Sequence, residues 1–284
     1  MDYILELHDV AKSYDDFSLE KVNFSLEKGC VMGLIGTNGA GKTTLIHIML
    51  GLIKKYTGTV KIFGMDIREH EREVKDLCGF ILDDNPFIEN ISAKSNARIF
   101  GPYYSKWDEE KFFSYCEKFQ INVKKPIKKL SQGTIIKLQL AFALSHDAKL
   151  FIFDEPSAGL DPVFRRELID IMYDLLIDGE RSILFSTHLT NDLDGIADYL
   201  TMIHNGNQLF SMTKEDLTSN YQLVRGSKEE VDTLPKNVIV GQKDAAVYSE
   251  ALVHLSKGEL EDYSCVLQPT IEDIMYYMVD GELV

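Results

Sequence analysis

A short glycine-rich segment constrains this chain more than any other feature. It reads Gly36-Thr-Asn-Gly-Ala-Gly41-Lys42-Thr43-Thr44 and matches the pattern GxxxxGK[ST]. The apolar run that ends at Ile35 predicts a strand before it, and apolar residues at helical spacing predict a helix from Lys42 to Leu52. In this context the segment is typical of a loop that binds nucleotide phosphates. A chance glycine-rich turn is the alternative, and the four specified positions with these flanks argue against it.

The loop predicts a set of phosphate contacts. Successive backbone N–H groups and the positive end of the following helix would surround the phosphates. Lys42 would reach the β- and γ-phosphates, and the Thr43 hydroxyl would bind Mg²⁺. The residues expected to bind ATP here are Gly36, Thr37, Asn38, Gly39, Ala40, Gly41, Lys42, Thr43 and Thr44.

A second motif places two carboxylates after a buried strand. The apolar run Leu150–Phe153 is followed directly by Asp154 and Glu155. Open α/β sheets bind ligands at the carboxyl ends of their strands. We therefore expect Asp154 to share the Mg²⁺ with Thr43, and Glu155 to orient or deprotonate a water molecule. Alone, such a pair is as often a turn or a helix cap, but the phosphate loop favours the functional interpretation.

Composition excludes several classes of protein. The 284 residues include 45 Asp and Glu against 30 Lys and Arg, and 45% are hydrophobic. This apolar content excludes wholesale disorder, and the net charge of −15 argues against a role dominated by nucleic-acid binding. No run approaches the roughly 18–20 apolar residues that span a bilayer. The four cysteines form no CxxC pair, which is typical of reduced thiols in a cytosolic protein.

Hydrophobic patterning predicts two regions. Residues 1–212 are expected to form an α/β domain with a helical insertion at about 86–145, and 213–284 a separate appendage with a final helix at 271–279. Asn205-Gly206 predicts a tight hairpin turn. Beyond the elements named above, strands are expected at 4–7, 17–24, 30–35, 59–63 paired with 80–82, 182–186, 199–204, 208–212, 222–224 and 238–240.

Taken together, these motifs resemble the nucleotide-binding subunit of ABC transporters over residues 2–212. The most specific further motif is Leu130-Ser131-Gln132-Gly133-Thr134, which is similar to the ABC signature. The resemblance implies an α/β fold, a P-loop NTPase of ABC ATPase type with a helical signature subdomain and a small C-terminal α/β appendage. It also implies that Ser131, Gln132 and Gly133 contact ATP held by a second subunit. Ser131 itself is a favourable N-cap for the helix after it.

Three more positions match the family. The segment 157–161 resembles the D-loop, which ends at Asp161, and His188 resembles the switch histidine that acts with Glu155 in catalysis. Tyr14 resembles the aromatic residue that stacks on adenine. A histidine after a strand is more often a packing residue, but its position relative to Glu155 favours the catalytic role.

Two positions depart from the family pattern. Asp83 stands where the family has a glutamine at the start of the helical insertion, and a carboxylate there remains a suitable oxygen ligand for Mg²⁺. Gln132 and Thr134 replace the commonest signature residues, whereas Ser131 and Gly133 are kept. Signatures of this kind resemble a branch of bacterial exporters that includes bacitracin- and lantibiotic-resistance systems.

The resemblance also implies partners and a cellular location. Two ATP-binding subunits would bind two ATP and Mg²⁺ head to tail and hydrolyse ATP. They would drive a separate integral membrane permease of an exporter from the cytoplasmic face of the plasma membrane. A helix of that permease is expected near the cleft between Asp83 and Trp107. The aromatic residues there suit an interface, although a locally packed core is an equal alternative: Phe100, Tyr103, Tyr104 and Trp107.

Two other functions fit the same motifs. One is a soluble ABC-type ATPase in DNA repair or on ribosomes, but the chain has neither a long coiled-coil insertion nor two fused ATPase units. The lysine-rich run 124–129 favours a solvated helix end over a nucleic-acid site. The other is an ATP-sensing partner in a heterodimer, and the intact Asp154–Glu155 pair and His188 argue against it.

Overall fold

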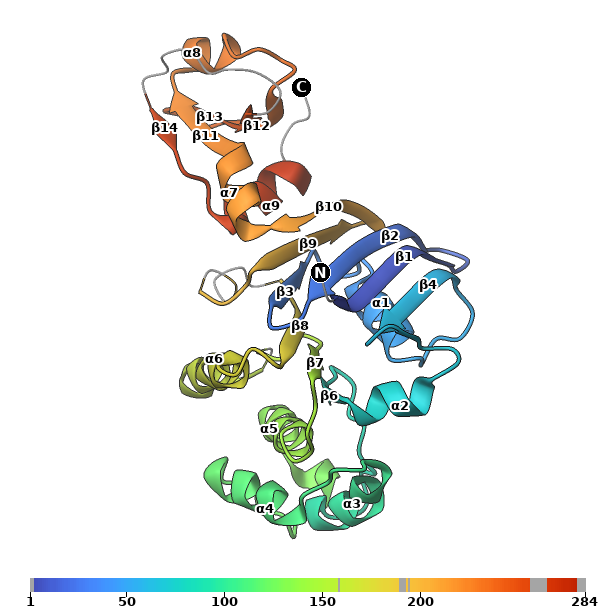
Figure 1. Ribbon diagram of the computed structural model, residues 1–284. Coiled ribbons are helices and arrows are strands. Elements are labelled where there is room, and N and C mark those ends of the chain that lie inside the picture. The colour runs from blue at the N-terminus through green and yellow to red at the C-terminus, as the bar shows by residue number, and fades with distance from the viewer. Residues whose placement is uncertain (1–2, 158, 189–192, 194, 256–264, 280–284) are drawn as a thin grey trace. The chain divides into compact units, whose positions relative to one another are not determined.

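The computed structural model describes residues 3–157, 159–188, 193, 195–255 and 265–279. By their contacts, the residues form two compact units (Figure 1). The first consists of Met1–His188 with Tyr199–Ser211, and the second of Leu189–Asp198 with Met212–Val284. Residues 195–198, which the sequence groups with the ATPase region, therefore belong to the second unit.

A six-stranded sheet forms the centre of the first unit. Its central strands are buried along their whole length and are mostly apolar, which is why parallel pairing is stable here. Four neighbouring pairs are parallel, so the carboxyl ends of these strands lie at one edge. The order is β10 (Asn207–Thr213), β9 (Tyr199–His204), β3 (Val31–Ile35), β8 (Ser182–Thr187), β7 (Leu150–Phe153) and β6 (Cys78–Ile81).

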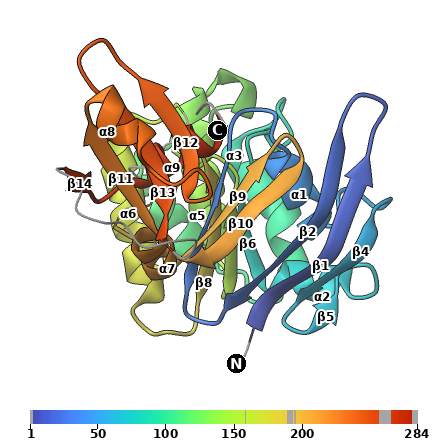
Figure 2. The same ribbon diagram turned by 90° about the horizontal axis from the view of Figure 1, so that it is seen from above.

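An antiparallel sheet lies beside it in the same unit, with its strands side by side in Figure 2. Its order is β2 (Ser18–Glu27), β1 (Tyr3–Ser13), β4 (Thr57–Ile62) and β5 (Met65–Asp66). The predicted pairing of 59–63 with 80–82 is wrong. The first segment pairs with β1 and β5, whereas the second belongs to β6 and pairs with β7. Both segments are apolar, and the composition alone does not specify the partner strand.

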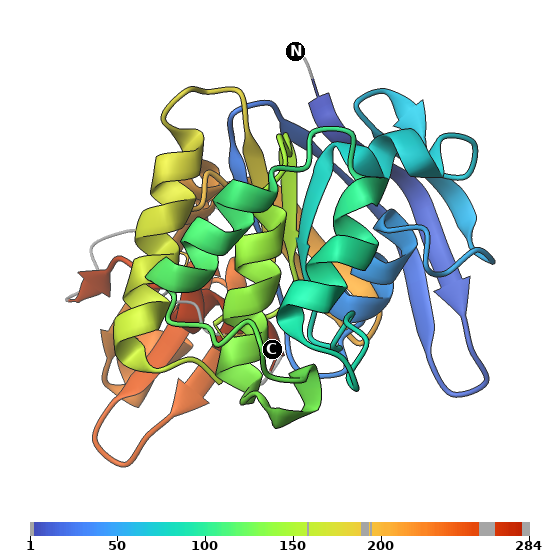
Figure 3. The ribbon, with the colours of Figure 1, turned by 90° about the horizontal axis from the view of Figure 1, so that it is seen from below.

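Helices of the first unit pack on the sheets, and those between 93 and 176 lie together in Figure 3. Four of them begin at a side chain that accepts a backbone N–H bond, namely Ser92, Asp108, Ser131 and Asp161. The predicted N-cap at Ser131 is confirmed. The helices are α1 (Lys42–Met49), α2 (Glu71–Asp76), α3 (Ala93–Phe100), η1 (Gly101–Tyr103), α4 (Glu109–Lys118), η2 (Ile127–Lys129), α5 (Gln132–Ala143) and α6 (Pro162–Leu176).

The second unit is an antiparallel sheet with a helix on each face. On β13, Ala251 and Val253 pack in the core with Val231 of α8, while Glu250 contacts Tyr277 of α9. Alternate residues of a strand face opposite sides, so α8 and α9 cover opposite faces. The elements are α7 (Lys214–Asn220), β11 (Tyr221–Gly226), α8 (Lys228–Asp232), β12 (Ile239–Asp244), β13 (Ser249–His254), β14 (Val266–Leu267) and α9 (Ile271–Val279), with sheet order β12-β13-β11-β14.

Among the described residues, no helix combines the length and the apolar character that crossing a bilayer requires.

Candidate nucleotide-binding site

The glycine-rich loop connects β3 to α1, as predicted, and holds Lys42 in a buried position. Lys42 is only 5% exposed, and its ammonium donates to the carbonyl oxygens of Gly36 at 2.9 Å and Thr37 at 3.2 Å. Gly41, at the N-cap of α1, has a φ of 112°, which residues with a Cβ rarely adopt. The loop therefore encloses a cation, with the N-terminus of α1 beside it.

A neighbouring hairpin supports this loop. The Asn205-Gly206 turn has positive φ at both residues, as a type I′ turn requires, so the predicted turn is confirmed. Gly206 N donates to Ala40 O at 3.0 Å, and Gly206 O accepts from Glu20 N at 2.8 Å. A Cβ at 206 would lie 1.7 Å from Ser18 O. The turn is thus inserted between the phosphate loop and β2, a contact that the sequence did not predict.

Replacing Gly206 with alanine tests this support, and Gly64→Ala is a matched control. Both glycines have φ near +75°, but a Cβ at 64 meets nothing within 4 Å. Gly64→Ala should cost about 1–2 kcal/mol of unfolding free energy from backbone strain alone. Gly206→Ala should cost at least about 2 kcal/mol more, because backbone must move, and should weaken nucleotide binding. Urea unfolding and nucleotide titration measure both effects; equal behaviour of the two variants would contradict the supporting role.

The two predicted carboxylates lie at the end of β7 and share one hydroxyl group. Ser186 Oγ donates to Asp154 Oδ1 at 2.6 Å and accepts from Glu155 N at 2.9 Å. Glu155 has a φ of 47°, an unusual conformation for a residue other than glycine. Sequence analysis missed Ser186. The strand register could have identified it. Phe153 pairs with Phe185, so the next residues, Asp154 and Ser186, are neighbours.

Glu155 connects the phosphate loop to His188. Its Oε1 lies 3.3 Å from Lys42 Nζ, and its Oε2 lies 2.8 Å from His188 Nδ1. The His188 side chain is 42% exposed, so it is not a packing residue of the core. The structure thus brings together Lys42, Glu155 and His188, which the sequence assigns to phosphate binding and catalysis.

Asp154 is suited to binding a metal ion. It is buried, and burial is the main reason that its pKa is raised, an effect that hydrogen bonds from Ser186 and Thr43 oppose and that the charges of Glu155 and Asp83 increase. Its Oδ2 is buried without a hydrogen-bond partner. Such an oxygen beside the Thr43 hydroxyl fits a hard cation such as Mg²⁺. Among the described residues, no three His, Cys, Asp or Glu side chains are close enough to hold a metal by themselves, so phosphate or water oxygens would complete the coordination.

Asp83 and the signature residues lie near one another. Asp83 is exposed, and its backbone oxygen accepts a 3.4 Å bond from Gln132 Nε2. Ser131 and Gln132 are exposed at the start of α5, and a Cβ on Gly133 would lie 3.1 Å from Gly159 O. Within the described residues, the signature therefore contacts Asp83 and the D-loop rather than the phosphate loop.

The D-loop ends at a helix cap. Asp161 accepts hydrogen bonds from Val163 N and Phe164 N at the start of α6, and these bonds lower the pKa of its carboxyl group. Its position is that of an N-cap, which is sufficient to explain the residue structurally. Residue 158 of this loop lies outside the described residues.

The predicted adenine-stacking residue is on the surface. Tyr14 is 45% exposed, and Lys12 Nζ lies 4.7 Å from its ring centroid. Phe17, whose ring centroid is 6.4 Å from that of Tyr14, is closer to the loop, since a Cβ on Gly41 would lie 2.9 Å from its ring. Phe17 is therefore a second aromatic candidate for base stacking, which sequence analysis missed because only Tyr14 matched the family position.

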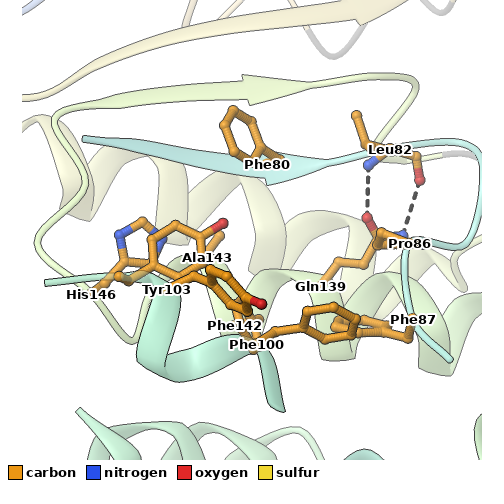
Figure 4. A pocket seen from close by; sticks show the side chains of 11 residues that line it. Phe80, Leu82, Pro86, Phe87, Phe100, Tyr103, Gln139, Phe142, Ala143 and His146 are labelled. Carbon is orange, nitrogen blue, oxygen red and sulfur yellow. Dashed lines mark hydrogen bonds between the residues drawn. The ribbon is translucent and has the colours of Figure 1, made fainter. Parts of the chain in front are cut away.

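An aromatic groove of about 220 Å³ lies between β6 and the helices α3, η1 and α5 (Figure 4). Tyr103 at its border is 72% exposed, whereas Trp107 packs on Phe112 and Phe142 and not in the groove. Trp107 therefore lies outside the groove lining, and its contacts are those of the locally packed core, the alternative that the sequence leaves open for this residue. The lining residues are Phe80, Leu82, Pro86, Phe87, Phe100, Tyr103, Tyr104, Gln139, Phe142, Ala143 and His146.

Known proteins share these motifs and this fold. The chain matches the family described as "ABC transporter" over residues 19–158. It is 32% identical over 214 residues to the bacitracin transport ATP-binding protein BcrA of Bacillus licheniformis, covering 74% of this chain and 69% of BcrA. It is also 32% identical over 206 residues to the lantibiotic transport ATP-binding protein SrtF of Streptococcus pyogenes, covering 72% of this chain and 88% of SrtF.

Solved structures lead to the same family. A structure described as the ATP binding subunit of an ABC transporter aligns with a TM-score of 0.69 and 25% identity, over 76% of this chain and 92% of that one. The alignments with relatives that are about one-third identical cover most of each relative's length. The relationship is therefore not limited to the phosphate loop. The chain therefore belongs to the family of ABC transporter ATP-binding proteins and is an ATPase of that family.

Proposed function

We propose that this chain is the ATP-hydrolysing subunit of an exporter whose membrane-spanning part is a separate polypeptide. The aromatic groove is the observation that carries the proposal. Its apolar lining and the largely exposed Tyr103 ring form a concave surface in the helical subdomain, at which a helix of a partner could bury apolar side chains. The names of the relatives, which refer to bacitracin and lantibiotic transport, support peptide antibiotics as the class of transported substrate.

The arrangement around Glu155 supports a specific division of roles. Its carboxylate is 15% exposed and is held between Lys42 and His188, so it can accept a proton from a water molecule at a defined place. Lys42 would leave its backbone contacts with Gly36 and Thr37 to bind phosphate oxygens. His188, on the other side, would hold Glu155 and contact the terminal phosphate.

Asp154, Thr43 and Asp83 would hold Mg²⁺ directly or through water. When bound, the ion neutralises phosphate charge. Such a cation would balance the charge of the site. Three carboxylates, Asp83, Asp154 and Glu155, interact there, and among the described residues Lys42 is the buried cation beside them. Ser186 keeps Asp154 and Glu155 in a fixed relative position.

Complete sites would form between two copies or two related subunits. Ser131 and Gln132 are exposed at the N-terminus of α5, where backbone N–H groups favour an anion. Among the described residues, their side-chain hydrogen bonds are with Thr134 and Asp83, and both side chains are exposed, so ATP bound by a second subunit could reach them. A head-to-tail dimer uses this surface and the phosphate loop at the same time.

Binding to membranes tests the proposed partner. A tagged full-length chain, expressed in the organism that carries its gene, should sediment with membranes and co-purify in detergent with a multi-span protein identified by mass spectrometry. Tyr103→Glu should lower the membrane-bound amount about tenfold, because it places a charge in an apolar contact. Ile177→Glu is the control, since Ile177 is 81% exposed and does not line the groove. Equal retention of the two variants would contradict docking at this groove.

A further inference from the structure

Gln139 forms two hydrogen bonds with the backbone of one residue at the edge of the aromatic groove (Figure 4). Leu82 N donates to Gln139 Oε1 at 2.7 Å, and Gln139 Nε2 donates to Leu82 O at 2.9 Å. Gln139 is only 2% exposed, and both bonds are partly buried. The carboxamide thus pairs with Leu82 in the way that a residue of an adjacent strand would.

The position of β6 in the sheet explains why this pairing is available. β6 is an edge strand, and β7 lies on its inner side. Asp154 N donates to Ile81 O at 2.8 Å across that inner side. The backbone groups of Leu82 that point the other way have no further strand to pair with, and Gln139 satisfies them.

One face of helix α5 contacts β6 and the residues directly after it at three places. A Cβ on Gly79 would lie 3.1 Å from Ala143 Cβ, so the glycine allows the helix and the strand to approach closely. Gln139 pairs with Leu82, and Gln132 Nε2 donates to Asp83 O at 3.4 Å. Positions 132, 139 and 143 lie on the same side of a helix. Helix α5, which begins at the signature, therefore contacts the segment 79–83 along its length.

We propose that Gln139 is a positioning residue that holds Asp83 at the nucleotide site and ties it to the signature helix. Leu82 directly precedes Asp83, and the neighbouring Ile81 O accepts from Asp154 N at 2.8 Å, so this segment lies beside the proposed metal ligand. Gln139, Leu82 and Ala143 also line the groove, so an occupant of the groove contacts the same connection. The inference rests on the proposed role of Asp83 in hydrolysis, and it provides a physical connection between the groove and the nucleotide site.

Steady-state ATPase measurements on the full-length chain test the proposal. Gln139→Met removes both hydrogen bonds and keeps the length of the side chain. Because a displaced Asp83 affects hydrolysis and not the phosphate loop, kcat should fall about tenfold while the KM for Mg²⁺-ATP stays within about twofold. Gln139→Leu removes the same bonds with a different shape and should lose the same activity. A loss in only one of the two variants would reflect packing and would overturn the proposal.

A double-mutant cycle tests whether Gln139 acts through Asp83. If it does, Gln139→Met combined with Asp83→Ala should be no slower than Asp83→Ala alone; additive losses would refute this route. Ser145→Ala is the control for the loss of a buried side-chain hydrogen bond in the same region. It removes the bond to Ala141 O and should leave kcat unchanged. Normal kcat in the Gln139 variants with a slow Asp83→Ala refutes this inference alone, whereas normal kcat in both sets also removes the role of Asp83.

Discussion

Glu155→Gln is expected to lower the rate of ATP hydrolysis by at least about 100-fold while ATP still binds. An amide of the same shape cannot accept the proton of the attacking water, and general-base catalysis typically contributes 10²–10⁴-fold. The change also removes the negative charge that now pairs with Lys42 at 3.3 Å. Lys42 then becomes more available to phosphate, so the Kd for ATP should stay equal or decrease. Single-turnover hydrolysis and nucleotide titration measure the two effects.

The matched control for this variant is Glu180→Gln. Glu180 is exposed and pairs with Lys28 at 2.7 Å, so its replacement changes the net charge equally without changing the site. Gel filtration with ATP adds a second readout, because the slow variant should accumulate as a dimer. Turnover of Glu155→Gln within threefold of the unchanged chain would rule out Glu155 as the base.

Lys42→Ala has the second large expected effect, and it acts on affinity. Lys42 is buried between the loop carbonyls and Glu155, and its ammonium would exchange the carbonyl contacts for phosphate oxygens. Hydrogen bonds to charged groups contribute about 1.5–3 kcal/mol each, so losing one or two should raise the Kd for ATP about 100-fold. A titration with a fluorescent ATP analogue measures this change.

Lys54→Ala provides the comparison for Lys42→Ala. Lys54 carries the same charge in the same unit, but its side chain is 59% exposed and pairs with Glu71. Exposed pairs of this kind contribute little, so the Kd for nucleotide should change less than about twofold. If both lysine variants bind ATP equally well, Lys42 does not contact the phosphates.

Where the sequence pattern is local, the structure agrees with it closely. The strand Leu150–Phe153 is uniformly apolar, and its predicted bounds are those observed. The final helix, Ile271–Val279, also begins and ends as predicted. Neighbouring residues cap its N-terminus, because Thr270 N donates to Asp273 Oδ2 at 2.8 Å and Asp273 N donates to Thr270 Oγ1 at 3.1 Å. These features depend on residues at most a few positions apart.

Features that depend on distant residues were not predictable in the same way. Strand β13 contains Glu250, which is buried because Tyr277 OH donates to its Oε1 at 2.6 Å and Arg225 Nε donates to its Oε2 at 2.5 Å. In the sequence, a glutamate at this place indicates an exposed loop. Gln139 likewise reads as a polar interruption of an apolar helix until the edge of β6 supplies its partners. Pattern alone therefore identified the site's motifs but not the residues that hold them in place.

The hydroxyl of Ser186 restricts which side chains evolution can accept at this position. The Ser186 oxygen both donates a hydrogen bond to Asp154 and accepts one from the Glu155 backbone, and Ser186 itself is fully buried. Of the small side chains, only serine and threonine can do both, since alanine does neither and cysteine does both poorly. Any movement of the proposed metal ligand also shifts the hydroxyl that orients the proposed base. Drift at position 186 would therefore alter metal affinity and hydrolysis together, and neither property could be adjusted there without the other.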